Sequence, residues 1–475
     1  NAALANLVNS KGLDSSLSGV YGKDINLISN NAYVNADNTV TIDGKTGLTL
    51  NATGKISATA QDDIYIRNSA PNTKVGEITS KAGDVYVTAS ESIEAAELTD
   101  SQTYNISGKD IYLTAENGKI GEAEDTKELV VNGTGKLTAT ATDDIGIRSL
   151  VDIFVNKITT SKTKDIRLVS DKNIKNANNF RSTTGDEVTE TDSNIVGNNL
   201  FIAAIGGGID DINVELDGEI TAYAGYSVDG TTRVNADSKL IISNVNSIID
   251  DSSITNAAEG LLQLNDLKIK EIKSTGNTLL ESEKSILGYN TGDVDVRSND
   301  MTLLAYNGSV GSALDYLNIV SAGNITANAT DSVYINSPED IRIKEIKAVQ
   351  DSSSDIKPVL NNVYITSDKS ILDGSQTGES SNIVAKYINL IAKDGSIGAL
   401  SDALDIALFG DGNGIEATAI STGGSIYLAS ADTDIHAINV IADVNIGLTA
   451  ANAGIIADSL NAGDEITLTA DKDIT

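Results

Sequence analysis

Carboxylates are the side chains of this chain whose chemistry is most readily named. Aspartates stand in pairs or near-pairs before short apolar runs, at Asp62-Asp63, Asp143-Asp144, Asp250-Asp251, Asp293/Asp295 and Asp432/Asp434. Such oxygen ligands can hold Ca²⁺, and two carboxylates facing each other across a groove are the minimum for glycoside hydrolysis. These acids recur along the chain, however, whereas a catalytic site would occur once. We therefore expect turn chemistry for most of them, no enzyme activity and no cofactor, with Ca²⁺ as the ion to test.

Other reactive groups are scarce. The chain has no cysteine and one histidine, His436, which stands at an outward position of an ordinary strand pattern. The 67 acidic and 34 basic residues give a net charge of −33, which makes nucleic acid an unfavourable partner. No apolar run approaches the roughly 20 residues that a membrane-spanning helix needs, so we expect no membrane span.

Tyrosines form a second set of candidate site residues. Each follows an aliphatic residue near the start of a short strand pattern, at Tyr65, Tyr86, Tyr112, Tyr334, Tyr364 and Tyr427. Because side chains alternate between the two faces of a strand, these rings are predicted to point outward. They could form an exposed strip that contacts glycans or a neighbouring fibre. The preference of tyrosine for strands accounts for the same positions, and both interpretations remain open.

The element that must position these residues is a long repeat. The block Ile111-Tyr-Leu-Thr-Ala-Glu-Asn-Gly-Lys-Ile-Gly121 recurs from Met301 and from Ile388, with looser copies from Ile25 and Leu200. The starting positions 25, 111, 200, 301 and 388 are therefore 86, 89, 101 and 87 residues apart. We predict one continuous β-solenoid over residues 1–475, with units at 25–110, 111–199, 200–300, 301–387 and 388–475. Polar stretches near 175–194, 226–256 and 348–358 are predicted to project as loops.

A second block, Ile/Leu-x-Ala-x-Ala, identifies the core. Its copies begin at Ile56, Leu137, Ile220, Ile325 and Ile415. In the second copy we expect Leu137, Ala139 and Ala141 to be buried, and Thr138 and Thr140 to be exposed. Stacked coils repeat one set of strands in order, and sandwiches do not. The prediction is an all-β, parallel β-helix of five units of about 90 residues, whose right-handed course is expected from known examples.

The blocks in Ile388–Gly398 and Leu317–Ile335 resemble those of filamentous-haemagglutinin-type bacterial surface adhesins. This resemblance covers nearly the whole chain and implies an exported, extracellular stalk on the bacterial cell surface, sent out by a partner pore. It also implies a role in attachment or biofilm, with glycans or proteins of host or neighbouring cells as partners. The secretion-recognition domain of that family has no counterpart here, so we expect a fragment of a longer stalk.

The alternative is a purely structural extracellular filament or surface-layer subunit. Because the chain stops in phase with its repeat, at Ala470-Asp-Lys-Asp-Ile474, we expect coil stacking to continue beyond both ends, within a longer chain or head-to-tail between subunits. A binding module should interrupt the repeat at one place, such as 226–256, whereas a structural rod should show register alone.

Overall fold

The computed structural model describes residues 19–42, 45–178, 193–244, 265–289, 292–350, 359–375, 381–410 and 412–475. Every regular secondary-structure element formed by these residues is a β-strand. These residues contain no helix that is long and apolar enough to cross a membrane. Contacts divide the chain into two compact units: unit 1 comprises Asn1–Asn179 with Asn194–Asn199, and unit 2 comprises Phe180–Ser193 with Leu200–Thr475. Most of the predicted loops at 175–194 and 348–358, and residues 245–256, lie outside the described residues.

Unit 1 consists of two parallel sheets, which we name 1A and 1B. Sheet 1A contains β1 (Gly19–Gly22), β3 (Val34–Ala36), β6 (Thr49–Ala52), β8 (Ile64–Asn68), β10 (Val85–Ala89), β13 (Ile111–Ala115), β15 (Lys136–Ala141), β17 (Ile153–Thr159), β19 (Ile174–Asn176) and β20 (Ile195–Gly197). Sheet 1B contains β2 (Ile25–Ile28), β7 (Lys55–Ala60), β9 (Thr73–Ser80), β11 (Ile93–Ala95), β12 (Ile106–Gly108), β14 (Leu129–Gly133), β16 (Ile145–Ser149) and β18 (Ile166–Ser170). A small antiparallel pair, β4 (Thr41–Ile42) and β5 (Lys45–Thr46), stands apart from them.

Unit 2 has the same construction, with sheets 2A and 2B. Sheet 2A contains β22 (Ile209–Leu216), β24 (Leu240–Asn244), β26 (Thr278–Ser282), β29 (Met301–Ala305), β31 (Asn324–Ala329), β33 (Ile341–Gln350), β36 (Ile371–Asp373), β37 (Ile383–Ala385), β39 (Leu404–Leu408), β41 (Ile426–Ser430), β43 (Ile446–Ala450) and β46 (Ile466–Ala470), with β34 (Val359–Leu360) antiparallel to the end of β33. Sheet 2B contains β21 (Leu200–Ala204), β23 (Glu219–Ala224), β25 (Leu267–Ser274), β27 (Ile286–Gly288), β28 (Val296–Ser298), β30 (Leu317–Ser321), β32 (Val333–Ser337), β35 (Asn362–Ser367), β38 (Tyr387–Ala392), β40 (Gly414–Ala419), β42 (Ile435–Ala442), β44 (Ile455–Ala457) and β45 (Leu460–Ala462).

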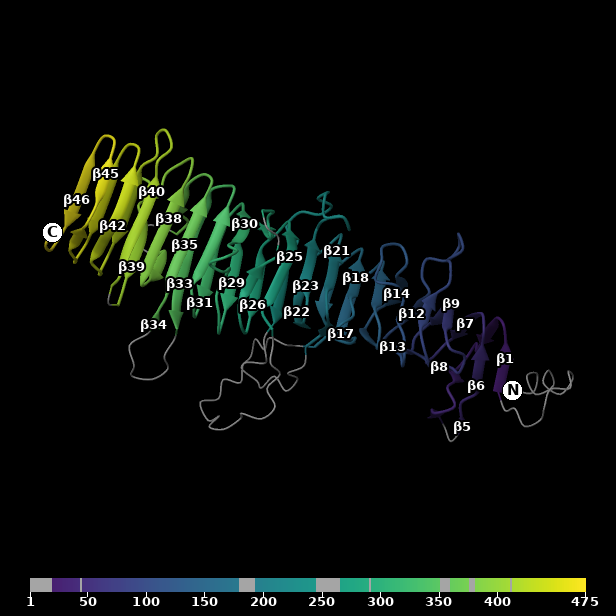
Figure 1. Cartoon of the computed structure of the whole chain (residues 1–475). Coiled ribbons are helices and arrows are strands. Elements are labelled where there is room, and N and C mark those ends of the chain that lie inside the picture. Colours follow the sequence, from purple (N-terminus) through teal and green to yellow (C-terminus); the bar gives the residue numbers. More distant parts are fainter. Residues whose placement is uncertain are drawn as a thin grey trace, which may run out of the picture. The chain divides into compact units, whose positions relative to one another are not determined.

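Some strands are split into two pieces of the same sheet: β3 with β6, β11 with β12, β19 with β20, β27 with β28, β36 with β37, and β44 with β45. When each split strand is counted once and the antiparallel strands β4, β5 and β34 are left out, successive strands belong alternately to the two sheets of their unit, so one strand from each sheet makes one coil. Within each unit the strands of a sheet stack in chain order (Figure 1). The predicted all-β parallel solenoid is therefore confirmed, whereas its handedness stays a prediction. Part of the predicted loop 226–256 belongs to the solenoid, because its residues 240–244 form β24, which pairs with β22 and β26.

The core lies between the two sheets of each unit and is built from short aliphatic side chains. In β15 the predicted alternation is confirmed: Leu137, Ala139 and Ala141 are buried, and Thr140 is exposed, while Thr138 is half-buried. The absence of tryptophan and the small number of phenylalanines suit this narrow space, because each coil adds only a thin layer of side chains.

Every copy of the Ile/Leu-x-Ala-x-Ala strand pairs with a bulged strand of the next coil. The register shifts in the pairs β7–β9, β15–β17, β23–β25, β31–β33 and β40–β42, always one or two residues after the leading Ile or Leu. In β33, for example, Ile343 and Ile346 are both buried although three positions apart, so Lys344 and Glu345 both lie outside the core. A bulge of this kind inserts one residue and re-aims the side chains that follow.

The repeat is seven strands long, which is three and a half coils. In unit 2 the opening blocks begin on β21 in sheet 2B, β29 in sheet 2A and β38 in sheet 2B, when the split strands β27–β28 and β36–β37 are each counted once and β34 is left out. In unit 1 the blocks begin on β2 in sheet 1B and β13 in sheet 1A, when β3 with β6 and β11 with β12 are each counted once. Consecutive copies therefore place equivalent side chains on opposite sheets of their unit.

Candidate functional site

The strand-initiating aspartates form ladders at the corners of the coils. Asp63 Oδ1 accepts a hydrogen bond from the backbone N–H of Asp84 at 2.8 Å, and Asp84 Oδ1 accepts one from the N–H of Asp110 at 3.1 Å. Asp110 Oδ1 in turn accepts the N–H of Lys136 at 2.8 Å. Each carboxylate thus satisfies a turn amide of the next coil, as turn chemistry predicts.

Three of the other predicted acids, Asp144, Asp295 and Asp434, accept a backbone N–H of a neighbouring coil, and Asp143 pairs with a cation. Asp144 Oδ1 accepts the N–H of Asp165 at 2.9 Å, and Asp434 Oδ1 accepts the N–H of Gly454 at 2.7 Å. A hydrogen bond from Lys164 holds the pKa of Asp143 below its ordinary value. Asp250 and Asp251 lie outside the described residues. Across the residues that are described, no three or more His, Asp or Glu side chains gather as metal ligands would; Ca²⁺ binding stays an untested prediction.

His436 lies on the outer face of β42 in unit 2. Its Nδ1 is 2.9 Å from the carbonyl oxygen of Asn413, and its Nε2 is 3.1 Å from Asp458 Oδ2. The ring therefore bridges a turn and a side chain of neighbouring coils.

The tyrosines of unit 1 form a stacked column on sheet 1A. Tyr65, Tyr86 and Tyr112 stand at matching positions of β8, β10 and β13. Their ring centroids are 4.6 and 4.5 Å apart, and the ring planes differ by 4° and 1°. Burial, followed by the negative charge of Asp84, raises the pKa of the Tyr86 hydroxyl well above its ordinary value. Both faces of the Tyr86 ring are covered by its neighbours.

Unit 2 has a longer column on sheet 2B. The rings of Tyr334 and Tyr364 stack at 4.9 Å with planes 2° apart. Tyr316 and Tyr387 flank them at centroid distances of 5.5 and 5.8 Å, with tilted planes. Sequence reasoning missed these two rings, although each stands directly before the leading aliphatic of its strand, in Tyr316-Leu317 and Tyr387-Ile388. The register between coils, which the sequence does not give, is what makes them neighbours.

Tyr427 is separate from both columns. It lies on β41 in sheet 2A, and its partner on the next strand is Gly447. Of the six tyrosines predicted as contact residues, five therefore fall into two columns and one stands without a neighbouring tyrosine at its rung. All six are half-buried on the outer faces of their sheets.

The stacking limits which parts of the tyrosine side chains in the two columns can contact a ligand. Where rings stack on each other, the inner faces are unavailable to a sugar, and the column offers ring edges and phenolic hydroxyls to solvent. Each stacked pair contributes roughly 0.5–1.5 kcal/mol beyond burial, so the columns also stabilise the coils that carry them.

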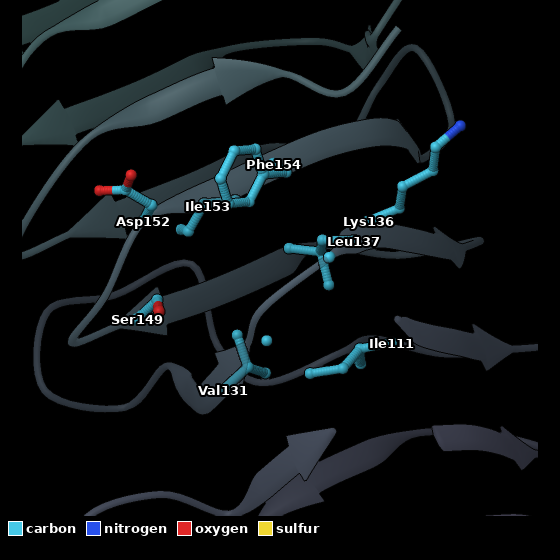
Figure 2. A pocket seen from close by; sticks show the side chains of 10 residues that line it. Ile111, Val131, Lys136, Leu137, Ser149, Asp152, Ile153 and Phe154 are labelled. Carbon is cyan, nitrogen blue, oxygen red and sulfur yellow. The ribbon is translucent and has the colours of Figure 1, made fainter. Parts of the chain in front are cut away.

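Described residues of unit 1 line a small and a large hollow. One, lined by Ile111, Val131, Leu137 and Phe154 among others, has a volume of about 10 Å³, which is room for about one water molecule (Figure 2). The other, of about 720 Å³, lies between the loops around Glu97 and Glu122. Two of its charged groups, Lys127 and Glu122, pair with each other at 3.4 Å, and Glu128 pairs with Arg167, which does not line the hollow.

Comparison of the chain with protein-family models, with curated proteins and with solved structures finds no match in any of the three. The repeat and the outer faces of the sheets are therefore the features of the molecule from which its function can be inferred.

Proposed function

We propose that this chain is part of the extracellular fibrous stalk of a bacterial cell-surface adhesin that mediates attachment or biofilm formation. The observation that carries the proposal is the combination of a solenoid repeat with tyrosine columns on its outer faces. The resemblance of the repeat blocks to filamentous-haemagglutinin-type adhesins supports the same class of protein. In this proposal the coils are a scaffold, and the partners are glycans or proteins of a host or neighbouring cell.

The seven-strand repeat supports a role in attachment. Because consecutive copies use opposite sheets of their unit, both outer faces carry equivalent positions, and Tyr334 on β32 corresponds in the repeat to Tyr427 on β41. A stalk with equivalent positions on both faces can contact partners on either side.

The test is attachment of coated beads. Beads carrying the protein should bind to cells or form aggregates with the producing bacterium, and soluble protein should compete. A variant with Tyr316, Tyr334, Tyr364 and Tyr387 replaced by threonine, a residue that other outward strand positions already carry, should bind less while still folding. Beads that bind no better than albumin-coated beads would overturn the proposal.

A purely structural filament is the second candidate, and one observation favours it. Tyr86 has both ring faces covered within its own chain, which is a stabilising arrangement and not a receptive one. For that function, electron microscopy of native material should show long, regularly joined filaments, and the threonine variant should lose stability without any specific loss of attachment.

A further inference from the structure

One outward column of the repeat is compared in three of its copies, those that begin at Ile111, Met301 and Ile388, and they differ in how the space outside the sheet is filled. The column consists of the residue before the leading leucine of one strand and the two residues opposite it on the next two strands. In the first version, in unit 1, it reads Glu128, Gly146 and Arg167. In the second, on sheet 2B, it reads Tyr316, Tyr334 and Tyr364. In the third, on sheet 2A, it reads Ala403, Tyr427 and Gly447.

In the first two versions, side chains of the protein itself fill the space outside the sheet. Arg167 Nε reaches across Gly146 to Glu128 Oε1 at 2.7 Å, and both charged side chains are nearly buried. In the second version three rings occupy three successive rungs, and Tyr334 and Tyr364 stack in parallel. In each case the outward space above the sheet contains side-chain atoms that interact with each other.

The third version has one ring and two small neighbours. Tyr427 lies between Ala403 and Gly447 at rungs where the second version has tyrosines. A Cβ atom at Gly447 would come within 2.7 Å of Tyr427 Cδ1, so the ring lies over the glycine backbone. A hollow of about 200 Å³ remains here, lined by Leu400, Ala403, Tyr427, Asn445, Thr449 and Glu465 among others.

The residues that line the hollow indicate which kind of ligand would fit it. Tyr427 and the 81% exposed Leu400 supply apolar surface, while Asn445, Thr449 and Glu465 surround it with hydrogen-bonding groups. One aromatic surface with several polar groups around it suits the ring of a sugar, which has apolar C–H faces and a rim of hydroxyls. The volume lies below the roughly 300–1,000 Å³ of sites for larger ligands, so it suits one sugar residue.

Charge restricts the kind of sugar. Glu465 stands at the hollow, and the whole chain carries a net charge of −33. Sialic and uronic acids would therefore be repelled. A protein partner is disfavoured, because a stable protein interface buries on the order of 1,000 Å² or more, and the exposed threonine and glutamate at this hollow do not form an apolar interface core.

We propose that the hollow beside Tyr427 binds the ring of a neutral sugar, such as the terminal residue of a cell-surface glycan, in the space that tyrosine rings fill in the equivalent column of sheet 2B. The site rests on the proposed adhesive function and gives it a ligand class. Tyr427 supplies the stacking surface. Asn445 Oδ1 accepts the backbone N–H of Glu465 at 3.2 Å and Glu465 Oε1 accepts the Thr467 hydroxyl at 3.3 Å, so the Asn445 amide NH₂ is the donor and Glu465 Oε2 the acceptor for hydroxyls of the sugar.

The experiment is saturation-transfer NMR of the whole protein with glucose, galactose, mannose and their N-acetylated amino sugars, with sialic and glucuronic acid as anionic probes. We expect transfer to the ring protons of at least one neutral sugar and none to the anionic sugars. Tyr427→Ala should weaken binding roughly tenfold or more. Gly447→Tyr should abolish binding, because the new ring fills the hollow and its Cβ, 2.7 Å from Tyr427 Cδ1, displaces the Tyr427 ring from the glycine. Circular dichroism shows whether the variant is folded.

Tyr65→Ala, which alters the unit 1 column alone, is the control and should leave sugar binding unchanged. Absence of transfer from every neutral sugar overturns the site, as does transfer that persists in the folded Gly447→Tyr variant. These outcomes are separate from those of the bead assay. Attachment that does not depend on Tyr427 leaves the adhesive function standing without this site, and sugar binding by a protein that attaches to no cell leaves the site standing without that function.

Discussion

Glycine is required at three turns because a carbonyl oxygen of the next coil lies where its Cβ would be. Gly121, Gly311 and Gly398 have φ values of 60°, 69° and 63° and face the carbonyls of Gly146, Tyr334 and Tyr427 respectively. The same three glycines end the opening block or its close copies, so the sequence shows that glycine recurs there. The sequence does not show why glycine is needed, because the contact joins residues that are 23 to 29 positions apart.

Gly311→Ala should lower the unfolding free energy of unit 2 by roughly 2 kcal/mol or more, because it adds a steric clash to an unfavourable φ. The matched control is Gly423→Ala. Gly423 also has a positive φ, of 94°, but no atom lies within 4 Å of the position of its Cβ. Urea denaturation followed by circular dichroism measures both variants. Equal losses in the two would show that backbone conformation alone, and not the facing carbonyl, selects glycine.

A charged substitution tests which side chains of the Ala-rich strand β15 point into the core. Ala139 is completely buried in β15, and its neighbour Thr140 is exposed on the same strand. Ala139→Asp should destabilise unit 1 by about 3–5 kcal/mol, because the carboxylate would be unpaired among aliphatic side chains. Thr140→Asp should change stability by about 0.5 kcal/mol or less. Thermal unfolding decides the matter, and an Ala139→Asp protein that melts like the parent would contradict the assigned core.

The stacked tyrosines of unit 1 make the stability of the folded protein depend on pH. Burial is the main cause that raises the pKa of the hydroxyls of Tyr65, Tyr86 and Tyr112, and nearby aspartates add to it. The folded state therefore favours the neutral phenol. Above the ordinary tyrosine pKa of about 10, the unfolded chain ionises first, so stability must fall as the pH rises from there towards the folded pKa.

We expect the unfolding temperature of the protein to drop between about pH 10 and 12, with tyrosinate absorbance appearing later than in denatured chain. Replacing all three residues by phenylalanine keeps the stack and removes the hydroxyls, and it should reduce the slope in this range. Ionisation of lysines contributes equally to both proteins, so the difference between them isolates the column. Identical slopes would show that the stacked phenols titrate as if they were exposed.

The regular elements could be predicted from the sequence, but their register could not. Alternating apolar residues give the strands, and the recurrence of Ile-x-Ala-x-Ala gives the fold class. The bulges were missed, although their signal is present: in Ile343-Lys-Glu-Ile346 the two buried residues are three positions apart, where a regular strand would have two or four. Tyr387 was missed for a similar reason, since turns of unequal length hide which rings are neighbours.

The repeat is half a coil longer than three coils, and a comparison of the sequence blocks alone does not show this. Similar sequence blocks suggest equivalent positions in the fold. Because the repeat has an odd number of strands, however, each block lies on the opposite sheet of its unit from the block before it. The count of apolar strand patterns between two opening blocks would have shown this, if the split strands such as β36 and β37 had been read as one. The two sheets must therefore be interchangeable for these sequences, because the same block occurs on β29 in sheet 2A and on β38 in sheet 2B.

Deletion of residues 301–387 tests this interchangeability. It removes one repeat and joins Asp300 to Ile388, so the block that begins at Ile388 would take the place of Met301 opposite Thr278 on β26. Every later strand would change sheets, but each would meet a partner of the expected type. We therefore expect one cooperative unfolding transition near that of the parent.

The control deletion removes residues 301–340, which contain β29 to β32 and amount to two full coils. Sheet identity is kept, but β33 now lies against β26. The bulge of β33 pairs with the Ile-x-Ala-x-Ala strand β31, whereas β26 pairs with β24 and β29 without any shift of register. This variant should therefore be less stable in chemical denaturation, although it removes fewer residues. If the order of stability is reversed, each strand sequence is adapted to one sheet, and the phase of the repeat is a feature of the sequence without a structural counterpart.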